Sequence, residues 1–202
     1  MTTKNIIRNF TDEEITQIAK LHYNNIESGF LSSLGEPFLK LIYFSLQQKG
    51  ILIGVRKDKM IVGFVSGVEN LSSVYTEFFR KNFLKAFFFI LPKIISVDVI
   101  KKLFDIALYP FKKKKTKEIE FPDAELLSIV VDAGYRGIGV ADMLYKELVK
   151  DFKSQNIKEF KIIVGGNLIA AQKFYAKMGA TKSKNINIHK GENSWIYLHQ
   201  IA

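Results

Sequence analysis

The stretch Ile129-Val-Val-Asp-Ala-Gly-Tyr-Arg-Gly-Ile-Gly-Val-Ala-Asp-Met-Leu144 changes its residue pattern twice. Residues Glu125 to Val131 are nearly all apolar, which predicts a strand that is buried on both faces. From Val140 the apolar side chains recur every four residues, which predicts an amphipathic helix. Glycines lie between the two, where the chain must turn sharply. A helix N-terminus after such a turn suits an anion such as a pyrophosphate.

The glycine-rich turn lacks the features of two common phosphate-binding motifs. No Gly-Lys-Ser/Thr follows it, so it is not a Walker loop, and Asp142 stands where a dinucleotide fingerprint has its third glycine. Its spacing is Arg-x-x-Gly-x-Ala, with Arg136, Gly139 and Ala141 at the fixed positions. Between a strand and a helix, this spacing resembles the acyl-CoA pyrophosphate loop of the GNAT acetyltransferase superfamily. The alternative is an ordinary strand–turn–helix corner.

The rest of the chain predicts a series of helices and strands. Before the turn we expect a strand over Lys4–Phe10, a helix starting with a capping box of Thr11 and Glu14, a connection over Phe30–Pro37, a helix over Pro37–Gln48, and strands over Ile51–Arg56 and Met60–Val68. After it we expect a strand over Glu159–Val164, a helix over Leu168–Met178, and a hairpin of Asn185–His189 and Ser194–His199. This order resembles that of the GNAT superfamily. The resemblance implies an α/β (α+β) fold, a mixed central sheet flanked by helices, in a single domain over residues 1–202.

Residues 75–117 depart from that resemblance, as a helical, basic and aromatic-rich insertion between the third and fourth strands. Aromatic residues at i, i+4 spacing from Phe79 to Phe87 predict one helix, Pro92 ends it, and a second helix is expected over Val97–Leu108. The segment has eleven basic and three acidic residues, so it carries most of the net charge of +10. The charge therefore indicates a local feature and not a generally basic surface.

Three interpretations of this insertion remain open. It packs on the body of the protein or on a second copy in a homodimer, it forms an apolar wall of the acceptor pocket, or it attaches to an anionic membrane surface. Its longest uncharged run, Ala86 to Pro92, has seven residues, whereas a membrane span needs about 20. We therefore expect no transmembrane helix.

The composition excludes several other kinds of site. The chain has no cysteine, and hence no disulfide, thiolate metal site or cysteine nucleophile. His22, His189 and His199 lie far apart, so we expect no metal. The N-terminus has no signal-peptide core, which predicts a cytoplasmic protein. We expect no nucleic-acid partner, because the basic residues do not follow the pattern of a known module.

The resemblance implies that the chain uses acetyl-CoA as its co-substrate. Backbone N–H groups of the turn would hold the pyrophosphate, with help from the Arg136 side chain: Arg136, Gly137, Ile138, Gly139, Val140 and Ala141. The edge of the preceding strand, over Ile129, Val130 and Val131, would pair with the pantetheine arm. A backbone N–H there would polarise the thioester oxygen.

The resemblance also supplies a base and an acid. Glu125, six residues before Val131, matches the catalytic glutamate of histone-type members, with Asp123 and Glu120 as fallbacks. The alternatives are a strand-start glutamate that faces water, and a water chain with no single base. Residues Asn167 to Gly179 resemble the family's Asn-x-x-Ala-x-x-Phe-Tyr-x-Lys-x-Gly, which makes Tyr175 the acid that protonates the CoA thiolate. Asn167 would contact pantetheine or cap its helix, since its spacing to Tyr175 is one residue longer than usual.

The acceptor site is the least specific part of the sequence. In this fold the first two helices, their connection and the last hairpin recognise the acceptor, so we expect Ser28, Phe30, Ser32 and Glu36 to line it. Two functions follow. The first is an N-acetyltransferase acting by direct attack of a small-molecule primary amine, such as an amino sugar. The second is a non-catalytic CoA-binding or membrane-surface module that uses the insertion.

Overall fold

A computed structural model describes residues 5–26, 30–90, 121–189 and 192–201 of this chain. Its centre is a seven-stranded sheet in the order β1-β2-β3-β4-β5-β7-β6. The strands are β1 (Asn5–Ile7), β2 (Ile51–Lys57), β3 (Met60–Val68), β4 (Glu125–Val131), β5 (Glu159–Gly165), β6 (Thr181–His189) and β7 (Glu192–Gln200). All neighbours pair antiparallel except β4 and β5, which are parallel. The expected mixed sheet flanked by helices is confirmed.

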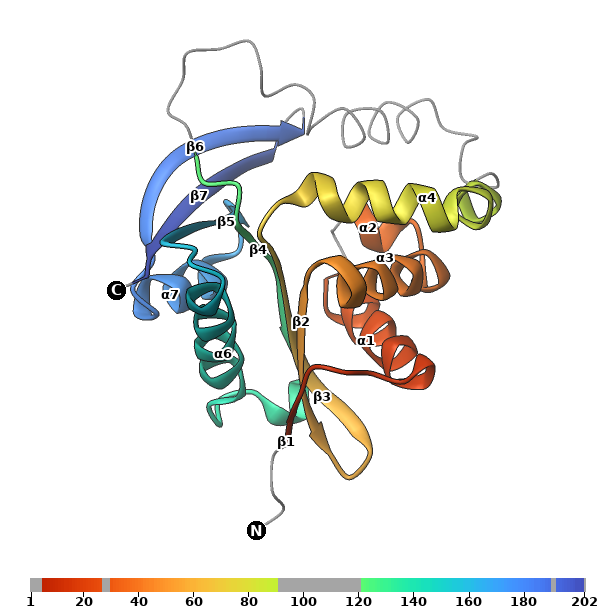
Figure 1. Ribbon diagram of the computed structural model, residues 1–202. Coiled ribbons are helices and arrows are strands. Elements are labelled where there is room, and N and C mark those ends of the chain that lie inside the picture. The colour runs from red at the N-terminus through yellow and green to blue at the C-terminus, as the bar shows by residue number, and fades with distance from the viewer. Residues whose placement is uncertain (1–4, 27–29, 91–120, 190–191, 202) are drawn as a thin grey trace.

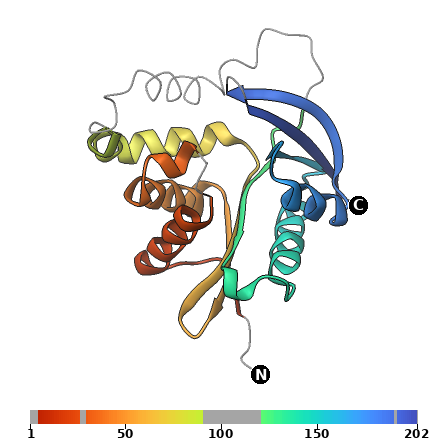
Figure 2. The same ribbon diagram turned by 180° about the vertical axis from the view of Figure 1, so that it is seen from behind.

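Helices cover both faces of the sheet (Figures 1 and 2). One face carries α1 (Asp12–Asn25), α2 (Phe30–Ser33), α3 (Glu36–Lys49) and α4 (Leu71–Ile90), and the other carries α6 (Val140–Ser154) and α7 (Ile169–Lys177). The predicted capping box of α1 is confirmed, because Thr11 Oγ1 accepts from the Glu14 N–H at 3.2 Å and Glu14 Oε2 accepts from the Thr11 N–H at 2.9 Å. Within the described residues, no helix is long and apolar enough to cross a membrane.

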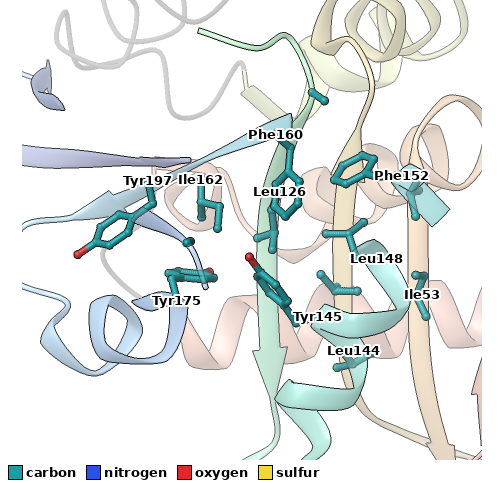
Figure 3. Close-up of a cluster of buried hydrophobic side chains, with 14 of the residues drawn as sticks. Ile53, Leu126, Leu144, Tyr145, Leu148, Phe152, Phe160, Ile162, Tyr175 and Tyr197 are labelled. Carbon is teal, nitrogen blue, oxygen red and sulfur yellow. The ribbon is translucent and has the colours of Figure 1, made fainter. Parts of the chain in front are cut away.

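The two faces have separate hydrophobic cores. Figure 3 shows the core under α6 and α7, where the α6 side chains Leu144, Leu148 and Phe152 are fully buried, as their spacing predicts. The rings of Phe152 and Phe160 lie 4.9 Å apart there. The second core packs α1 and α3 on the sheet through residues such as Ile15. β4 lies between the two cores and contributes to both.

β4 is paired unequally on its two sides. It pairs with β3 from Glu125 to Val131, but with β5 only at Glu125–Lys161 and Leu126–Ile162. Beyond Leu126 the two parallel strands separate. We call this separation the β4–β5 splay. Over Ile129–Val131, one edge of β4 has no strand partner among the described residues.

A β-bulge interrupts β4 just where the splay begins. Ser128 pairs with Ser66 and Leu126 pairs with Gly67, so Leu127 is the extra residue. A bulge places two successive side chains on the same face of a strand. Leu127 accordingly packs with Val130 in the core under α1 and α3, whereas Leu126 belongs to the core under α6.

The structure corrects three expectations about element boundaries. Phe30–Ser33, expected within a connection, forms the short helix α2. Helix α4 starts at Leu71 and not at residue 75, because Asn70 Oδ1 accepts from the Ser72 N–H at 2.8 Å and caps the helix start. Strand β6 starts at Thr181, four residues before the predicted start.

The described part of the insertion packs on the body of the protein. Phe78 of α4 is buried and its ring meets that of Phe38 of α3 edge-on, with centroids 5.4 Å apart. Phe79, Leu84 and Phe89 of the same helix remain exposed. The second predicted helix, Val97–Leu108, and the lysine run at 112–115 lie outside the described residues.

Candidate active site

The splay exposes the backbone of β4 at the residues predicted to hold pantetheine. The Asp132 N–H donates to Val62 O at 2.9 Å, so the backbone of Asp132 faces β3. Backbone direction alternates along a strand, and Val130 therefore also faces β3. Ile129 and Val131 turn their N–H and C=O groups toward the splay.

The glycine-rich turn leaves open space in front of its backbone. It begins as a short 3-10 turn, Ala133–Tyr135, and continues through Gly137 and Gly139, whose φ angles are +75° and +82°. These angles favour glycine, and a Cβ built at either position would meet no atom within 4 Å. Gly139 is the N-cap of α6 and has no side chain with which to cap it. The open cradle and the first-turn N–H groups of α6 fit the pyrophosphate of coenzyme A.

Arg136 links this turn to helix α1. Its Nε donates to Val131 O at 3.1 Å, and its guanidinium also donates to Asn25 Oδ1. Asn25 in turn donates from Nδ2 to Leu21 O at 2.8 Å. Arg136 therefore ties the end of β4 to the end of α1.

An ion pair joins the two helices beside the splay. Asp142 lies in the first turn of α6, and Lys177 Nζ on α7 is 2.7 Å from Asp142 Oδ2. A carboxylate at a helix N-terminus would repel a bound anion, and the ammonium group offsets that charge.

Tyr175 lies in the core beside the splay, where it is 7% exposed. Figure 3 shows its hydroxyl end turned toward that of Tyr145 of α6, and the ring centroids are 6.3 Å apart. Burial raises the pKa of Tyr175, and that of Tyr145 is raised by burial and further by Tyr175. The Tyr145 hydroxyl has no hydrogen-bond partner among the described residues. Both phenols remain protonated at neutral pH.

Asn167 does not cap α7. The N-cap residue is Leu168, without a side-chain hydrogen bond, and the Asn167 side chain is exposed in the turn after β5. Gln172 instead fixes this turn, because its Nε2 donates to Gly165 O at 3.2 Å and to Gly166 O at 2.9 Å. The capping alternative for Asn167 is therefore wrong.

Glu125 lies at the closed end of the splay and does not face water. It is 7% exposed, and its Oε2 is 3.6 Å from Nζ of Lys161, its partner on β5. Lys161 Nζ also donates to Pro122 O at 2.6 Å. Along a strand, the four residues from Glu125 to Ile129 span about 13 Å. A proton passing between these two positions would need water to carry it.

The predicted acceptor residues have different environments. Ser32 is buried and its hydroxyl donates to Ile26 O at 2.5 Å, which holds the corner between α1 and α2. Glu36 lies in the first turn of α3, Phe30 begins α2, and Ser28 is outside the described residues. A surface cavity of about 700 Å³ lies at the opposite end of β3 and α6 from the glycine-rich turn, and Glu69 and Gln155 are among its lining residues. The described residues contain no cluster of three or more metal-ligating side chains.

A buried polar chain on the α1–α3 side of β4 was not predicted from the sequence. His22 of α1 is 3% exposed and its Nδ1 lies 2.5 Å from the hydroxyl oxygen of Tyr43 of α3, which is 2% exposed. The Tyr43 hydroxyl also forms a hydrogen bond with Ser128 of β4. Burial lowers the pKa of His22 to about 4, so its imidazole is neutral at pH 7. The only sequence signal was a histidine on the buried face of a helix.

The chain is similar to acyltransferases, in sequence over one segment and in overall fold. Residues 98–180 match the model of the Acetyltransferase (GNAT) family. The fold matches an N-acetyltransferase from Staphylococcus aureus (TM-score 0.61, 11% identity, 100% of both chains). It also matches the ribosomal-protein-S18-alanine N-acetyltransferase from Escherichia coli (TM-score 0.60, 11% identity, 99% of this chain and 95% of that one).

A third match is the PaiA N-acetyltransferase from Thermoplasma acidophilum, solved in complex with coenzyme A (TM-score 0.60, 13% identity, 98% of this chain and 99% of that one). A search of curated protein sequences found no match. The structural likenesses establish the fold. The family match adds that residues 98–180 are similar in sequence to the GNAT acetyltransferases.

Proposed function

We propose that the chain transfers an acetyl group from acetyl-CoA to a primary amine of a small molecule, by direct attack without an acyl-enzyme. The observation that carries this proposal is the β4–β5 splay, which runs toward an uncapped helix N-terminus with an open glycine cradle. The coenzyme A complex of the similar Thermoplasma protein supports the same co-substrate. An amino sugar is one acceptor class, which rests on the resemblance to GNAT proteins alone.

Backbone groups bind the co-substrate. N–H groups from Arg136 to Ala141 hold the pyrophosphate, and the exposed edge of β4 from Ile129 to Val131 pairs with the pantetheine arm. The N–H of Ile129 or Val131 donates to the thioester oxygen, where negative charge develops during attack. Asn167 reaches pantetheine from the turn after β5.

The chemical step forms a C–N bond and breaks the C–S bond. The amine nitrogen attacks the thioester carbonyl carbon and loses a proton to Glu125 through water. The CoA thiolate leaves and takes a proton from the Tyr175 hydroxyl. Tyr175 suits this role because it remains protonated at neutral pH and lies beside the splay. On the acceptor side, Ser28, Phe30, Ser32 and Glu36 remain the residues predicted to line the approach of the amine.

Calorimetric titration with acetyl-CoA tests this proposal. We expect micromolar binding by the wild-type protein and none by Gly139→Glu, which places a carboxylate in the pyrophosphate cradle. Gly179→Glu is a matched control, because Gly179 also has a positive φ of +88° but lies after α7. Equal loss of binding in both variants, or no binding by the wild type, would show that the turn does not hold acetyl-CoA. Thiol release with a panel of primary amines then identifies the acceptor.

Exposed side chains of α4 favour a second function, attachment to an anionic membrane surface. Along this helix the large apolar residues Phe79, Leu84 and Phe89 are exposed, and so are Lys81 and Lys85. Sedimentation with phosphatidylserine vesicles at low salt tests this function, and Leu84→Asp should reduce the bound fraction. Absence of wild-type binding would exclude it.

A further inference from the structure

The buried polar chain described above reaches the point where the acceptor amine would attack. We propose that Ser128 binds the acceptor amine by accepting a hydrogen bond from its N–H, and that Tyr43 and His22 are positioning residues that hold the Ser128 hydroxyl in the accepting orientation. This inference rests on the proposed function, because it assigns a residue of the same site.

In the proposed site, Ser128 would lie next to the reacting carbonyl. Ser128 immediately precedes Ile129, whose backbone N–H turns toward the splay. Its side chain lies on the opposite face from those of Ile129 and Val131, on the side of α1 and α3. Tyr43 and His22 are buried, whereas Ser128 retains part of its surface exposed. An amine that arrives from the side of the first helices would meet this hydroxyl.

The neutral histidine sets the direction of the hydrogen bonds. When Nδ1 of a neutral His22 accepts the Tyr43 proton, the Tyr43 oxygen accepts the proton of the Ser128 hydroxyl. The remaining lone pair of Ser128 Oγ is then directed at the amine. Accepting an amine N–H leaves the nitrogen lone pair for the carbonyl carbon. Protonation of Nδ1 would reverse the chain and direct the Ser128 proton at that nitrogen.

The surroundings of the chain indicate a role beyond packing. These polar side chains lie in an apolar core, where the ring centroids of Tyr43 and Phe64 are 5.0 Å apart. Burying polar groups destabilises the fold unless the groups form hydrogen bonds. Ser66, directly opposite Ser128 on β3, points to the same face, and its Oγ is fully buried with no hydrogen-bond partner in the described part of the chain. Ser128, which retains part of its surface exposed, is therefore the hydroxyl of this pair that a ligand can reach.

Steady-state kinetics with one amine test the assignment. The probe is whichever of glucosamine, galactosamine, spermidine and lysine amide is acetylated fastest by the wild type. Ser128→Ala should lower kcat/KM for that amine about tenfold or more, because it removes a hydrogen bond to the nucleophile, while the Kd for acetyl-CoA stays the same. Ser45→Ala, which removes another buried hydroxyl from the same side of the sheet, is the control and should not change kcat/KM. Wild-type kcat/KM in Ser128→Ala would overturn the proposal.

The positioning residues are tested by conservative replacement. His22→Asn places an amide oxygen close to the position of Nδ1 and should keep most of the activity, whereas His22→Leu and Tyr43→Phe should each raise the amine KM and lower kcat. Equal kinetics in His22→Asn and His22→Leu would contradict the orientation argument.

Nuclear magnetic resonance gives a readout that does not depend on turnover. In long-range ¹H–¹⁵N spectra of the acetyl-CoA complex at pH 7, we expect His22 Nδ1 to be unprotonated. A protonated Nδ1 would overturn the proposal even if none of the four amines is acetylated. Loss of acetyl-CoA binding by the wild type would instead contradict the proposed function, so the two failures are distinguishable.

Discussion

In the proposed site, the edge of β4 toward β5 and the face of β4 toward α1 and α3 use different chemistry. On the splay side, the proposed functional groups are mainly backbone N–H groups from Ile129 to the glycine-rich turn, supported by the phenol of Tyr175. On the α1–α3 side, the proposed groups are the side chains of His22, Tyr43 and Ser128, which come from three separate elements. A backbone site suits a co-substrate with fixed chemistry, whereas a side-chain site can be changed to suit an acceptor. Variants that affect one face and not the other test this division.

The largest effect is expected from Tyr175 on the splay side. Tyr175→Phe should lower kcat about 100-fold or more, because it removes the proton donor for the leaving thiolate, without changing the Kd for acetyl-CoA. Tyr145→Phe is the matched control, because it removes a buried hydroxyl that lacks a partner within the described residues. Thiol-release kinetics and calorimetry measure the two quantities. An unchanged kcat in Tyr175→Phe would remove this hydroxyl from the mechanism.

The next effect is a pH dependence of stability on the α1–α3 side. Burial lowers the pKa of His22 to about 4 from an ordinary value of 6.5, so between these values the unfolded chain binds a proton that the folded chain does not. The contribution of the neutral histidine is complete above about pH 6.5 and is lost as the pH falls toward 4. Urea unfolding should show wild type losing about 3 kcal/mol more than His22→Asn from pH 7 to pH 4.

His199 provides the comparison on the splay side. Burial also lowers its pKa, but its ring is less buried than that of His22. His199→Asn should therefore reduce the pH dependence less than His22→Asn does. The opposite ranking would contradict the assignment of His22 as the main buried neutral histidine.

The smallest effect is expected from the ion pair between α6 and α7. Lys177→Glu leaves Asp142 uncompensated beside the pyrophosphate cradle and should weaken acetyl-CoA binding about three- to tenfold, less at high salt. Lys150→Glu changes the same charge at the far end of α6, where Lys150 pairs with Glu147, and should leave the Kd unchanged. Titration at two salt concentrations measures both variants. Equal weakening by both would indicate a general effect of charge.

The features on the splay side of β4 were easier to predict from the sequence than those on the α1–α3 side. The strand Glu125–Val131, the glycine turn and the helix from Val140 depend on residues close together in the chain, and the structure contains all three. The start of α4 was missed although a local signal was present, since Asn70 is a good N-cap residue.

The polar chain on the acceptor side could not be predicted from spacing. His22 and Tyr43 are 21 residues apart, and Ser128 follows much later in the sequence. They meet only because α1 and α3 pack on the same face of β4, and because the bulge turns Ser128 toward them. The ion pair of Glu125 with Lys161 was missed for the same reason, because it depends on a parallel pairing of two residues.

The short pairing between β4 and β5 also affects how the chain folds. Strands β1 to β4 all come from residues 5–131, and β5 to β7 from residues 159–200, so each half of the sheet forms from neighbouring segments. In the described part of the chain, two strand residue pairs join these halves of the sheet, and α6 connects the halves in sequence. Local opening between β4 and β5 breaks fewer backbone hydrogen bonds than opening between β3 and β4 or between β5 and β7. The amide hydrogens of Ile129 and Val131, which turn toward the splay, are therefore expected to exchange earlier than those shared by β2 and β3.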